Sequence, residues 1–333
     1  MGSTDRHDRV AGAVAAARST LQRIVVLRGG AIGDFMLTLP VLTALRRRFV
    51  GTPLTVIGQP AVTPLALAGG LADEARSLEG RQLAGFFQPQ GELDAGVRAV
   101  FGEAQLVVSY LHDPARILEQ NVRRCLPPNA QFLGGPHRPS EAAGVHATDA
   151  LLAPLRDLGI TDADPVPRLA LPATTTSWKP RPTLRWLAVH PGSGSQRKNW
   201  PEANWAGLLE TLAEDAGTGL LLVGGEAEAG TIERLCRHVP AARLRVALQR
   251  PLPELGAWLG QCAAFLGHDS GITHLAAAVG LPVVALWGNT AEAVWRPRCA
   301  RLRIVRGQQG VTSISRQDVV AALADQVAAH VDL

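Results

Sequence analysis

Residues 264–290 read AFLGHDSGITHLAAAVGLPVVALWGNT, and this stretch decides the fold class. It contains two short, continuous apolar runs, AFLG and VVALW, which are separated by a polar turn and an Ala-rich segment. Continuous apolar runs of this length, each joined to a turn and a helix, are typical of strands buried on both faces of a parallel sheet. The stretch therefore predicts a strand–helix–strand unit of an α/β fold.

The same rhythm recurs in two blocks, on either side of a Pro- and Thr-rich stretch at residues 164–183. Each block has the pattern of a doubly wound, Rossmann-like domain, whose ligand crevice lies at the carboxyl ends of its strands. A helix from about Phe35 to Phe49 is expected after the first strand. We predict strands at Ile24–Arg28, Leu54–Ile57, Leu106–Ser109 and Gln131–Leu133 in the first block, and at Leu184–His190, Gly219–Val223, Ala264–Gly267 and Val283–Trp287 in the second.

The chain divides accordingly into a disordered lead-in, an N-terminal domain, a C-terminal domain and a closing helix, at residues 1–20, 21–175, 176–314 and 315–333. The apolar block of the lead-in is too short and too weak for a secretion signal. Ser315, with Asp318 three residues on, forms a capping-box pattern at the start of the closing helix. Its apolar residues recur on one helical face, at Val319, Val320, Leu323 and Val327.

Length and composition fit two folded domains. The 333 residues are about twice the usual domain length, and 47% hydrophobic against 19% charged residues excludes global disorder. The four cysteines form no C-x-x-C pair, which argues against a disulfide framework or a zinc site and favours a reducing compartment. No apolar run reaches the length of a membrane-spanning helix, so we expect a cytoplasmic protein.

The charge pattern restricts the partners. The formal net charge is +4, and the basic excess is spread along the chain instead of forming a tail or stripe. This mild bias fits anionic small ligands or an anionic membrane surface as well as nucleic acid. One Tyr and seven Phe disfavour platforms on which bases could stack, so we expect no nucleic-acid partner.

Several common chemistries lack their motifs. The turn RGGAIG at residues 28–33 has Arg28 where a dinucleotide-binding G-x-G-x-x-G requires Gly. No acidic residue follows between Phe35 and Gly70 to bind a ribose. The chain also contains no P-loop, no G-x-S-x-G elbow and no H-E-x-x-H motif.

Two segments combine small residues with groups that can do chemistry. Asp34 follows Gly33 at the mouth of the first helix, where an Asp serves as a helix cap or, in a crevice, as a general base. Residues 190–201 read HPGSGSQRKNWP, in which the hydroxyls of Ser193 and Ser195 and the ammonium of Lys198 suit a pyrophosphate. Only two of the 33 basic residues are lysines, which favours a compact point charge at 198 over a solvated basic loop.

Two further segments follow buried strands. Glu226 stands directly after Gly224-Gly225, where it either binds ribose hydroxyls or is an ordinary surface residue. Residues 267–275 read GHDSGITHL and lead from a strand into a helix whose N-terminal amides can receive phosphate. Helix capping accounts for either Asp269 or Ser270 but not for the whole polar cluster.

Together these segments resemble glycosyltransferase family 9, the ADP-heptose:lipopolysaccharide heptosyltransferases. Residues 30–49 look like the family's opening strand–loop–helix, residues 190–201 like its donor-phosphate loop, and residues 267–290 like its late signature. The resemblance extends from about Arg23 to Val327. It implies the GT-B architecture of two facing Rossmann-like domains. It also implies transfer of a heptose from ADP-heptose to the lipopolysaccharide inner core, with inversion and without a metal or other cofactor.

The resemblance also implies residue roles. Asp34 would be the catalytic base, and the N-terminal domain would bind the acceptor. The donor-binding residues would be Gly33, Ser193, Ser195, Lys198, Glu226, Asp269, Ser270, Gly271 and His274. Among them, Lys198 with Ser193 would hold the donor phosphates, and Glu226 would meet the ribose. A lipopolysaccharide acceptor implies transient contact with the inner-membrane surface, and hence a cytoplasmic, peripheral enzyme.

Two other functions remain open from the sequence. One is a nucleotide-sugar epimerase of the same architecture, which would need no acceptor. The other is a catalytically silent ADP-sugar-binding protein, against which an intact Asp34 argues. Activity with an acceptor, activity without one, and binding without turnover distinguish the three.

Overall fold

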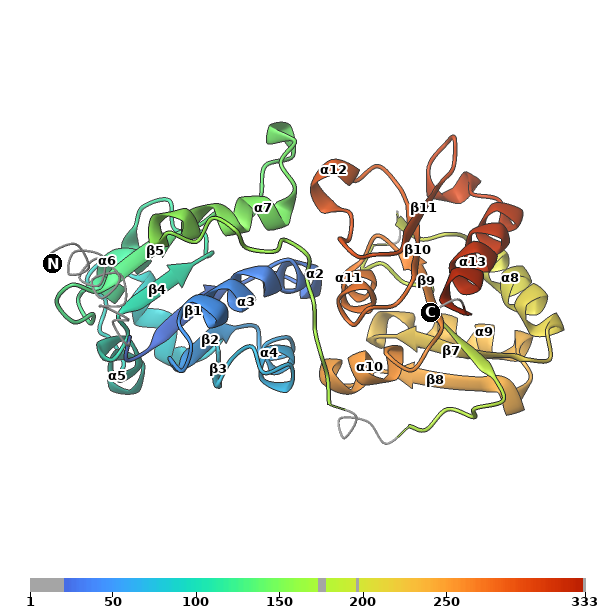
Figure 1. The fold of residues 1–333 in the computed structure, drawn as a ribbon, viewed down its shortest axis with the longest axis horizontal. Helices are drawn as coiled ribbons and strands as arrows, with labels where there is room; N and C mark the ends of the chain where they lie inside the picture. The colour runs from blue at the N-terminus through green and yellow to red at the C-terminus, as the bar shows by residue number, and fades with distance from the viewer. Residues whose placement is uncertain (1–20, 173–177, 196–197, 332–333) are drawn as a thin grey trace, which may run out of the picture.

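The computed structural model describes residues 21–172, 178–195 and 198–331 of the chain. The predicted lead-in at residues 1–20 and part of the Pro- and Thr-rich stretch therefore lie outside the described residues. The chain forms two α/β halves that lie side by side, joined by a linker that crosses between them (Figure 1).

The N-terminal half is built on a five-stranded sheet in the order β3-β2-β1-β4-β5. Neighbouring strands are parallel throughout. The strand order changes direction between β1 and β4, and the carboxyl ends at such a switch point are where open α/β sheets bind ligands. The strands are β1 (Ile24–Arg28), β2 (Leu54–Gly58), β3 (Glu74–Ser77), β4 (Leu106–Ser109) and β5 (Gln131–Gly134).

The C-terminal half repeats this plan with six parallel strands in the order β11-β10-β9-β6-β7-β8. Its switch point lies between β6 and β9. The strands are β6 (Arg185–His190), β7 (Thr218–Gly224), β8 (Leu244–Leu248), β9 (Ala264–His268), β10 (Val283–Trp287) and β11 (Leu302–Arg306).

Helices cover the sheets of both halves (Figure 1). The N-terminal half contains α2 (Ile32–Met36), α3 (Leu39–Arg48), α4 (Pro64–Ala68), α5 (Ala95–Gly102), α6 (Ile117–Arg123) and α7 (Ala147–Leu152). The C-terminal half contains α8 (Glu202–Glu214), α9 (Ala229–Leu235), α10 (Leu252–Leu259), α11 (Gly271–Ala278), α12 (Glu292–Trp295) and α13 (Arg316–Val331). The 3₁₀ segments are η1 (Arg81–Phe87), η2 (Glu141–Ala143), η3 (Ala153–Leu158), η6 (Glu226–Glu228), η7 (Cys236–His238), η8 (Ala241–Arg243) and η9 (Val311–Ser313).

The predicted strands are confirmed, and the structure adds β3, β8 and β11, which sequence analysis missed. All three lie at sheet edges. An edge strand is exposed along one side, so charged residues interrupt its apolar run, as in EARS, LRVAL and LRIVR. The signal that identified the buried strands is therefore absent from these sequences.

The helix predicted from Phe35 to Phe49 is wrong in one respect, because the structure divides it into α2 and α3. The break follows Met36, and Pro40 stands in the first turn of α3. Proline has no N–H to donate to the carbonyl four residues back, and its ring clashes with that carbonyl. The break leaves α2 as a short helix at the carboxyl end of β1.

The closing helix α13 begins with the predicted cap. The Ser315 hydroxyl accepts a hydrogen bond from the N–H of Asp318 at 3.1 Å and donates to its carboxylate at 2.7 Å. Val319, Leu323 and Val327 are buried in the core beneath the C-terminal sheet. The residue boundaries of the domains themselves stay a prediction.

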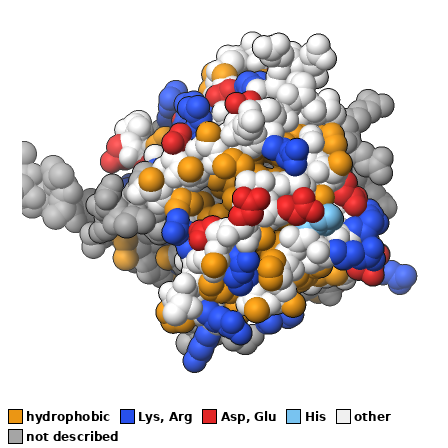
Figure 2. Space-filling view, turned by 90° about the vertical axis from the view of Figure 1, so that its right-hand side faces the viewer, with side chains coloured by type: hydrophobic (Ala, Val, Ile, Leu, Met, Phe, Trp, Pro, Cys, Tyr) orange, Lys and Arg blue, Asp and Glu red, His pale blue; other side chains and the backbone are white. Residues whose placement is uncertain are grey.

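The outer face of the C-terminal half carries acidic and basic side chains interspersed with apolar ones (Figure 2). Within the described residues, no helix combines the length and the apolar character needed to cross a bilayer.

Candidate active site

Asp34 lies in the first turn of α2, at the carboxyl end of β1. Its Oδ2 accepts a hydrogen bond from the N–H of Ala31 at 2.9 Å, so the capping interpretation is confirmed. The cap engages only one oxygen. The other, Oδ1, lies 3.3 Å from Nη2 of Arg28, and the side chain keeps 29% of its surface exposed. The same carboxylate is thus exposed at the carboxyl end of β1, where it can contact a ligand.

In the sequence, Arg28 stands out only as the residue that breaks a dinucleotide motif, whereas the structure places it against Asp34. The Arg28 side chain is buried at the end of β1, and burial lowers the pKa of its guanidinium, an effect that the Asp34 carboxylate opposes. One signal in the sequence could have identified Arg28 as a site residue: it is a basic residue in the last position of an otherwise apolar, buried strand.

The two halves of the molecule meet at this point, because α2 packs against α11. The contact is made at glycines: a Cβ on Gly271 would lie 2.6 Å from Cβ of Ile32 and 2.8 Å from N of Gly33. Both distances are shorter than real Cβ contacts. Gly271 therefore allows the start of α11 to approach the first turn of α2, which carries Asp34.

His274 is buried at this contact instead of lying open at the loop surface. Its ring lies near Gly33, with Cδ2 3.5 Å from the position of a Cβ there. Burial lowers the pKa of His274 to about 4, although Asp269 and Asp34 favour its charged form. The imidazole is therefore neutral at physiological pH.

Lys198 forms an ion pair at the carboxyl ends of β6 and β9, with Nζ 2.8 Å from Oδ2 of Asp269. The structure thus unites two predicted donor-binding segments, the loop after β6 and the turn after β9. Asp269 is largely buried, whereas the Lys198 side chain is 42% exposed and open to a ligand. The pair fixes the ammonium beside the start of α11.

The loop after β6 is internally bonded. The Ser193 hydroxyl lies 2.6 Å from Oδ1 of Asn199 and 2.7 Å from the carbonyl oxygen of Ser195, and it accepts a bond from the N–H of Ser195. Ser193 is half-buried, and Ser195 is exposed. The structure therefore gives the Ser193 hydroxyl a role in shaping the loop.

His268, which the sequence did not single out, anchors both sides of the same loop. Its Nε2 accepts a hydrogen bond from the N–H of Trp200 at 2.7 Å, so Nδ1 carries the proton and donates to the carbonyl of Gly192 at 3.0 Å. Burial lowers the pKa of His268 to about 4. The neutral imidazole couples the end of β9 to the loop that carries Lys198.

Two other predicted residues, Ser270 and Glu226, also lie at the carboxyl ends of strands in the C-terminal sheet. Ser270 caps α11, accepting a hydrogen bond from the N–H of Thr273 at 3.4 Å. Glu226 is exposed at the carboxyl end of β7. Glu228, not Glu226, forms the capping box, accepting from the N–H of Gly225 at 2.9 Å. Glu226 is thereby left free to meet a ligand.

A cavity of about 260 Å³ lies at the carboxyl ends of β4 and β5. Its wall includes Asp113, Glu119 and the neighbouring rings of His112 and His137, whose centroids are 4.5 Å apart and whose planes are tilted by 59°. The carbonyl of His137 accepts a hydrogen bond from Nη1 of Arg28 at 2.9 Å. The cavity therefore adjoins the residues that surround Asp34.

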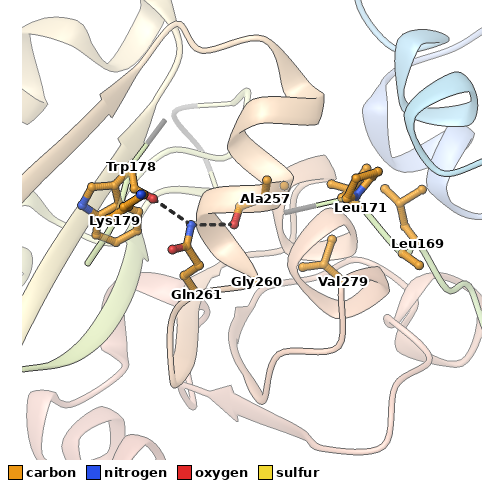
Figure 3. A pocket seen from close by; sticks show the side chains of 11 residues that line it. Leu169, Leu171, Trp178, Lys179, Ala257, Gly260, Gln261 and Val279 are labelled. Carbon is orange, nitrogen blue, oxygen red and sulfur yellow. Dashed lines mark hydrogen bonds between the residues drawn. The ribbon is translucent and has the colours of Figure 1, made fainter. Parts of the chain in front are cut away.

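A larger cavity of about 550 Å³ lies between the linker and α10. Figure 3 shows Gln261 at its wall, donating to the carbonyls of Trp178 and Ala257. None of the described residues that line it belongs to the predicted site. In the described part of the chain, no three His, Cys, Asp or Glu side chains lie together as a group that could hold a metal ion.

Comparison with known proteins identifies the family. The model of glycosyltransferase family 9 (heptosyltransferase) matches residues 136–322, which is more than half of the chain. The chain belongs to glycosyltransferase family 9. The predicted family is confirmed, and with it the prediction of a glycosyltransferase.

The relatives within glycosyltransferase family 9 are distant. A lipopolysaccharide heptosyltransferase 3 of Escherichia coli is 22% identical over 302 residues, covering 80% of this chain and 83% of the relative. The enzyme of the same name from E. coli K12 is 29% identical over 166 residues, and that match spans 47% of the relative.

Solved structures of the family confirm the GT-B fold. A family 9 glycosyltransferase of Veillonella parvula superposes with a TM-score of 0.74 at 19% identity, covering 94% of this chain and 99% of that one. The ADP-heptose lipopolysaccharide heptosyltransferase II of E. coli gives 0.75 at 18% identity, covering 92% and 98%.

Proposed function

We propose that this family 9 glycosyltransferase moves a heptose from ADP-heptose to a hydroxyl of the lipopolysaccharide inner core, with inversion and Asp34 as general base. One observation carries the proposal: the first turn of α2, which carries Asp34, packs through Ile32 and Gly33 against the start of α11, next to the ion pair of Lys198 and Asp269. A base and a cation are thereby contributed by the two halves of the molecule, on either side of the contact between α2 and α11.

The donor is assigned to the C-terminal half. The E. coli relative whose structure was solved with ADP has the same fold, with a TM-score of 0.71, and the related enzymes are named for heptose transfer. In this chain, the Lys198 ammonium and the N–H groups at the start of α11 are suited to hold a diphosphate. Glu226, exposed at the end of β7, is suited to hold ribose hydroxyls.

The acceptor is assigned to the cavity beside His112 and His137. Imidazole nitrogens and carboxylates supply donors and acceptors for sugar hydroxyls. The cavity adjoins Asp34 through the bond from Arg28 to the His137 carbonyl. A lipopolysaccharide acceptor implies that the enzyme works at the cytoplasmic face of the inner membrane, as a peripheral protein.

The reaction then proceeds in one displacement. The acceptor oxygen bonds to the anomeric carbon as its proton passes to Asp34, and the bond from that carbon to the diphosphate breaks. ADP leaves with the electron pair, and Lys198 with the amides of α11 stabilises its developing charge. Attack from the face opposite the leaving group inverts the configuration. General-base action of this kind contributes about 10²–10⁴-fold.

The test is a transfer assay with ADP-heptose and heptose-deficient lipopolysaccharide, followed by mass spectrometry of the glycan and measurement of ADP release. Asp34→Asn keeps an oxygen to accept the Ala31 N–H but lacks the base, so transfer should fall about 10²–10⁴-fold while ADP still binds. Asp94→Asn is the matched control, because Asp94 caps α5 by accepting from the N–H of Val97 at 3.0 Å, and it should transfer normally.

The outcomes separate the alternatives. A heptosylated product, formed equally well with EDTA present, supports the proposal. Isomerisation of a nucleotide sugar without an acceptor would identify an epimerase instead. Binding of ADP-heptose without turnover would identify a silent binding protein. Near-normal turnover of Asp34→Asn would reduce Asp34 to a helix cap.

A further inference from the structure

Arg28 is a buried arginine in which each of the three guanidinium nitrogens makes a hydrogen bond. It is the last residue of β1, and only 2% of its side chain is exposed. Withdrawing a guanidinium from water is costly unless its donors are all used, so a buried arginine calls for an explanation. Its contacts come from three segments that surround the N-terminal switch point.

Most of these contacts go to one residue, Asp34. Nε and Nη2 of Arg28 donate to the main-chain oxygen of Asp34 at 3.3 and 3.2 Å, and Nη2 also approaches its Oδ1 at 3.3 Å. The Thr38 hydroxyl donates to the same main-chain oxygen at 2.8 Å. One guanidinium thus fixes both the backbone and the carboxylate of Asp34.

The other two segments are the loop after β5, where His137 lines the cavity at the ends of β4 and β5, and the end of β4, which Tyr110 follows. Nη1 of Arg28 donates to the His137 carbonyl, and the guanidinium carbon lies 6.0 Å from the centre of the Tyr110 ring. The Tyr110 hydroxyl donates to the carbonyl of Leu151 at 2.6 Å, which holds that ring in place. Arg28 therefore links Asp34 to the cavity by a rigid connection.

We infer that Arg28 is the positioning residue of the catalytic base: it holds the backbone and the carboxylate of Asp34 in place beside the acceptor cavity. The inference rests on the function proposed above. Arg28 touches neither donor nor acceptor, and it acts through Asp34. Guanidinium geometry matters, since a planar fork reaches a carbonyl and a carboxylate at once whereas an ammonium is a point charge.

The test compares Arg28→Lys and Arg28→Met with the wild-type enzyme. Arg28→Met should lower kcat about 10²-fold, the usual cost of displacing a catalytic group by about 1 Å, while the affinity for ADP stays unchanged. Arg28→Lys should recover part of this loss because it restores the charge but not the fork. Arg23→Met is the matched control: Arg23 precedes the other end of β1 and is paired with Glu74 at 2.7 Å.

The comparison of kcat with the affinity for ADP separates positioning from simple structural support. A site that collapses without Arg28 would lose both quantities, whereas a misplaced Asp34 lowers kcat alone. The loss in Arg28→Met should therefore be confined to kcat, and Arg28→Lys should recover part of it. Arg23→Met should leave both quantities at their wild-type values.

Each result decides the question. If wild type transfers heptose and the folded Arg28 variants match its kcat, the inference is overturned and the proposed function stands. If Arg28→Met does not fold, Arg28→Lys alone decides, through a lower kcat at unchanged affinity for ADP. If wild type forms no heptosylated product, the proposed function fails and the role of Arg28 falls with it.

Discussion

Replacement of Gly271 by alanine tests whether the two halves must touch for catalysis. The new Cβ would lie 2.6 Å from Cβ of Ile32, whereas two carbons in contact prefer about 3.5–4.0 Å. The halves would have to separate by about 1 Å at the contact between α2 and α11. A contact between two halves opens more readily than a packed core deforms. We therefore expect α11 to move away from α2, with little change inside either half.

The expected magnitude follows from that displacement. Moving a catalytic group by about 1 Å costs about 10²-fold in rate, so kcat should fall by that factor. Overpacking should also lower the free energy of unfolding by about 1–3 kcal/mol. The N–H groups at the start of α11 are retained, so the affinity for ADP should stay close to that of the wild type.

The assay combines kcat for heptose transfer, calorimetry of ADP binding and chemical denaturation. Gly102→Ala is the control, because a Cβ at Gly102, the last residue of α5, would meet only the Cys125 carbonyl at 3.7 Å. A Gly271→Ala enzyme with wild-type kcat would refute the reasoning, since catalysis would then not depend on this close approach.

Three further outcomes are expected. Lys198→Ala should weaken binding of ADP, and Lys198→Arg should restore it incompletely because a planar fork replaces a point charge; unchanged affinity by calorimetry in both variants would remove Lys198 from the phosphate site. His268 and His274 have pKa values of about 4 against 6.5 for a free imidazole, so the unfolded chain binds more protons between these values. The free energy of unfolding should therefore fall as the pH drops from about 6.5 towards 4, by up to about 3 kcal/mol per histidine, and a flat profile in denaturant titrations would contradict their neutral burial. Replacing His112 and His137 together by alanine should raise KM for the acceptor but not the affinity for ADP, and an unchanged acceptor KM would argue against the cavity as its binding site.

The sequence predicted the central strands and the chemistry at their carboxyl ends. A strand buried on both faces is apolar along most of its length, so β1, β9 and β10 are recognised in the sequence as short, continuous apolar runs. The edge strands β8 and β11 lack that constraint and were missed. Local rules also identified the capping chemistry of Ser315 and Asp34, because a cap and its partner are three residues apart.

What the sequence could not provide is the pairing of distant groups. The ion pair between Lys198 and Asp269 joins residues 71 positions apart, and the bond from Arg28 to the His137 carbonyl spans 109. A local pattern cannot specify which loops meet at a sheet edge, because strand order and the packing of α2 on α11 decide that. The sequence by itself therefore determined the fold class and the kinds of reactive groups. Only the tertiary structure decided that Arg28 holds Asp34, and that Gly271 brings this carboxylate to the C-terminal half.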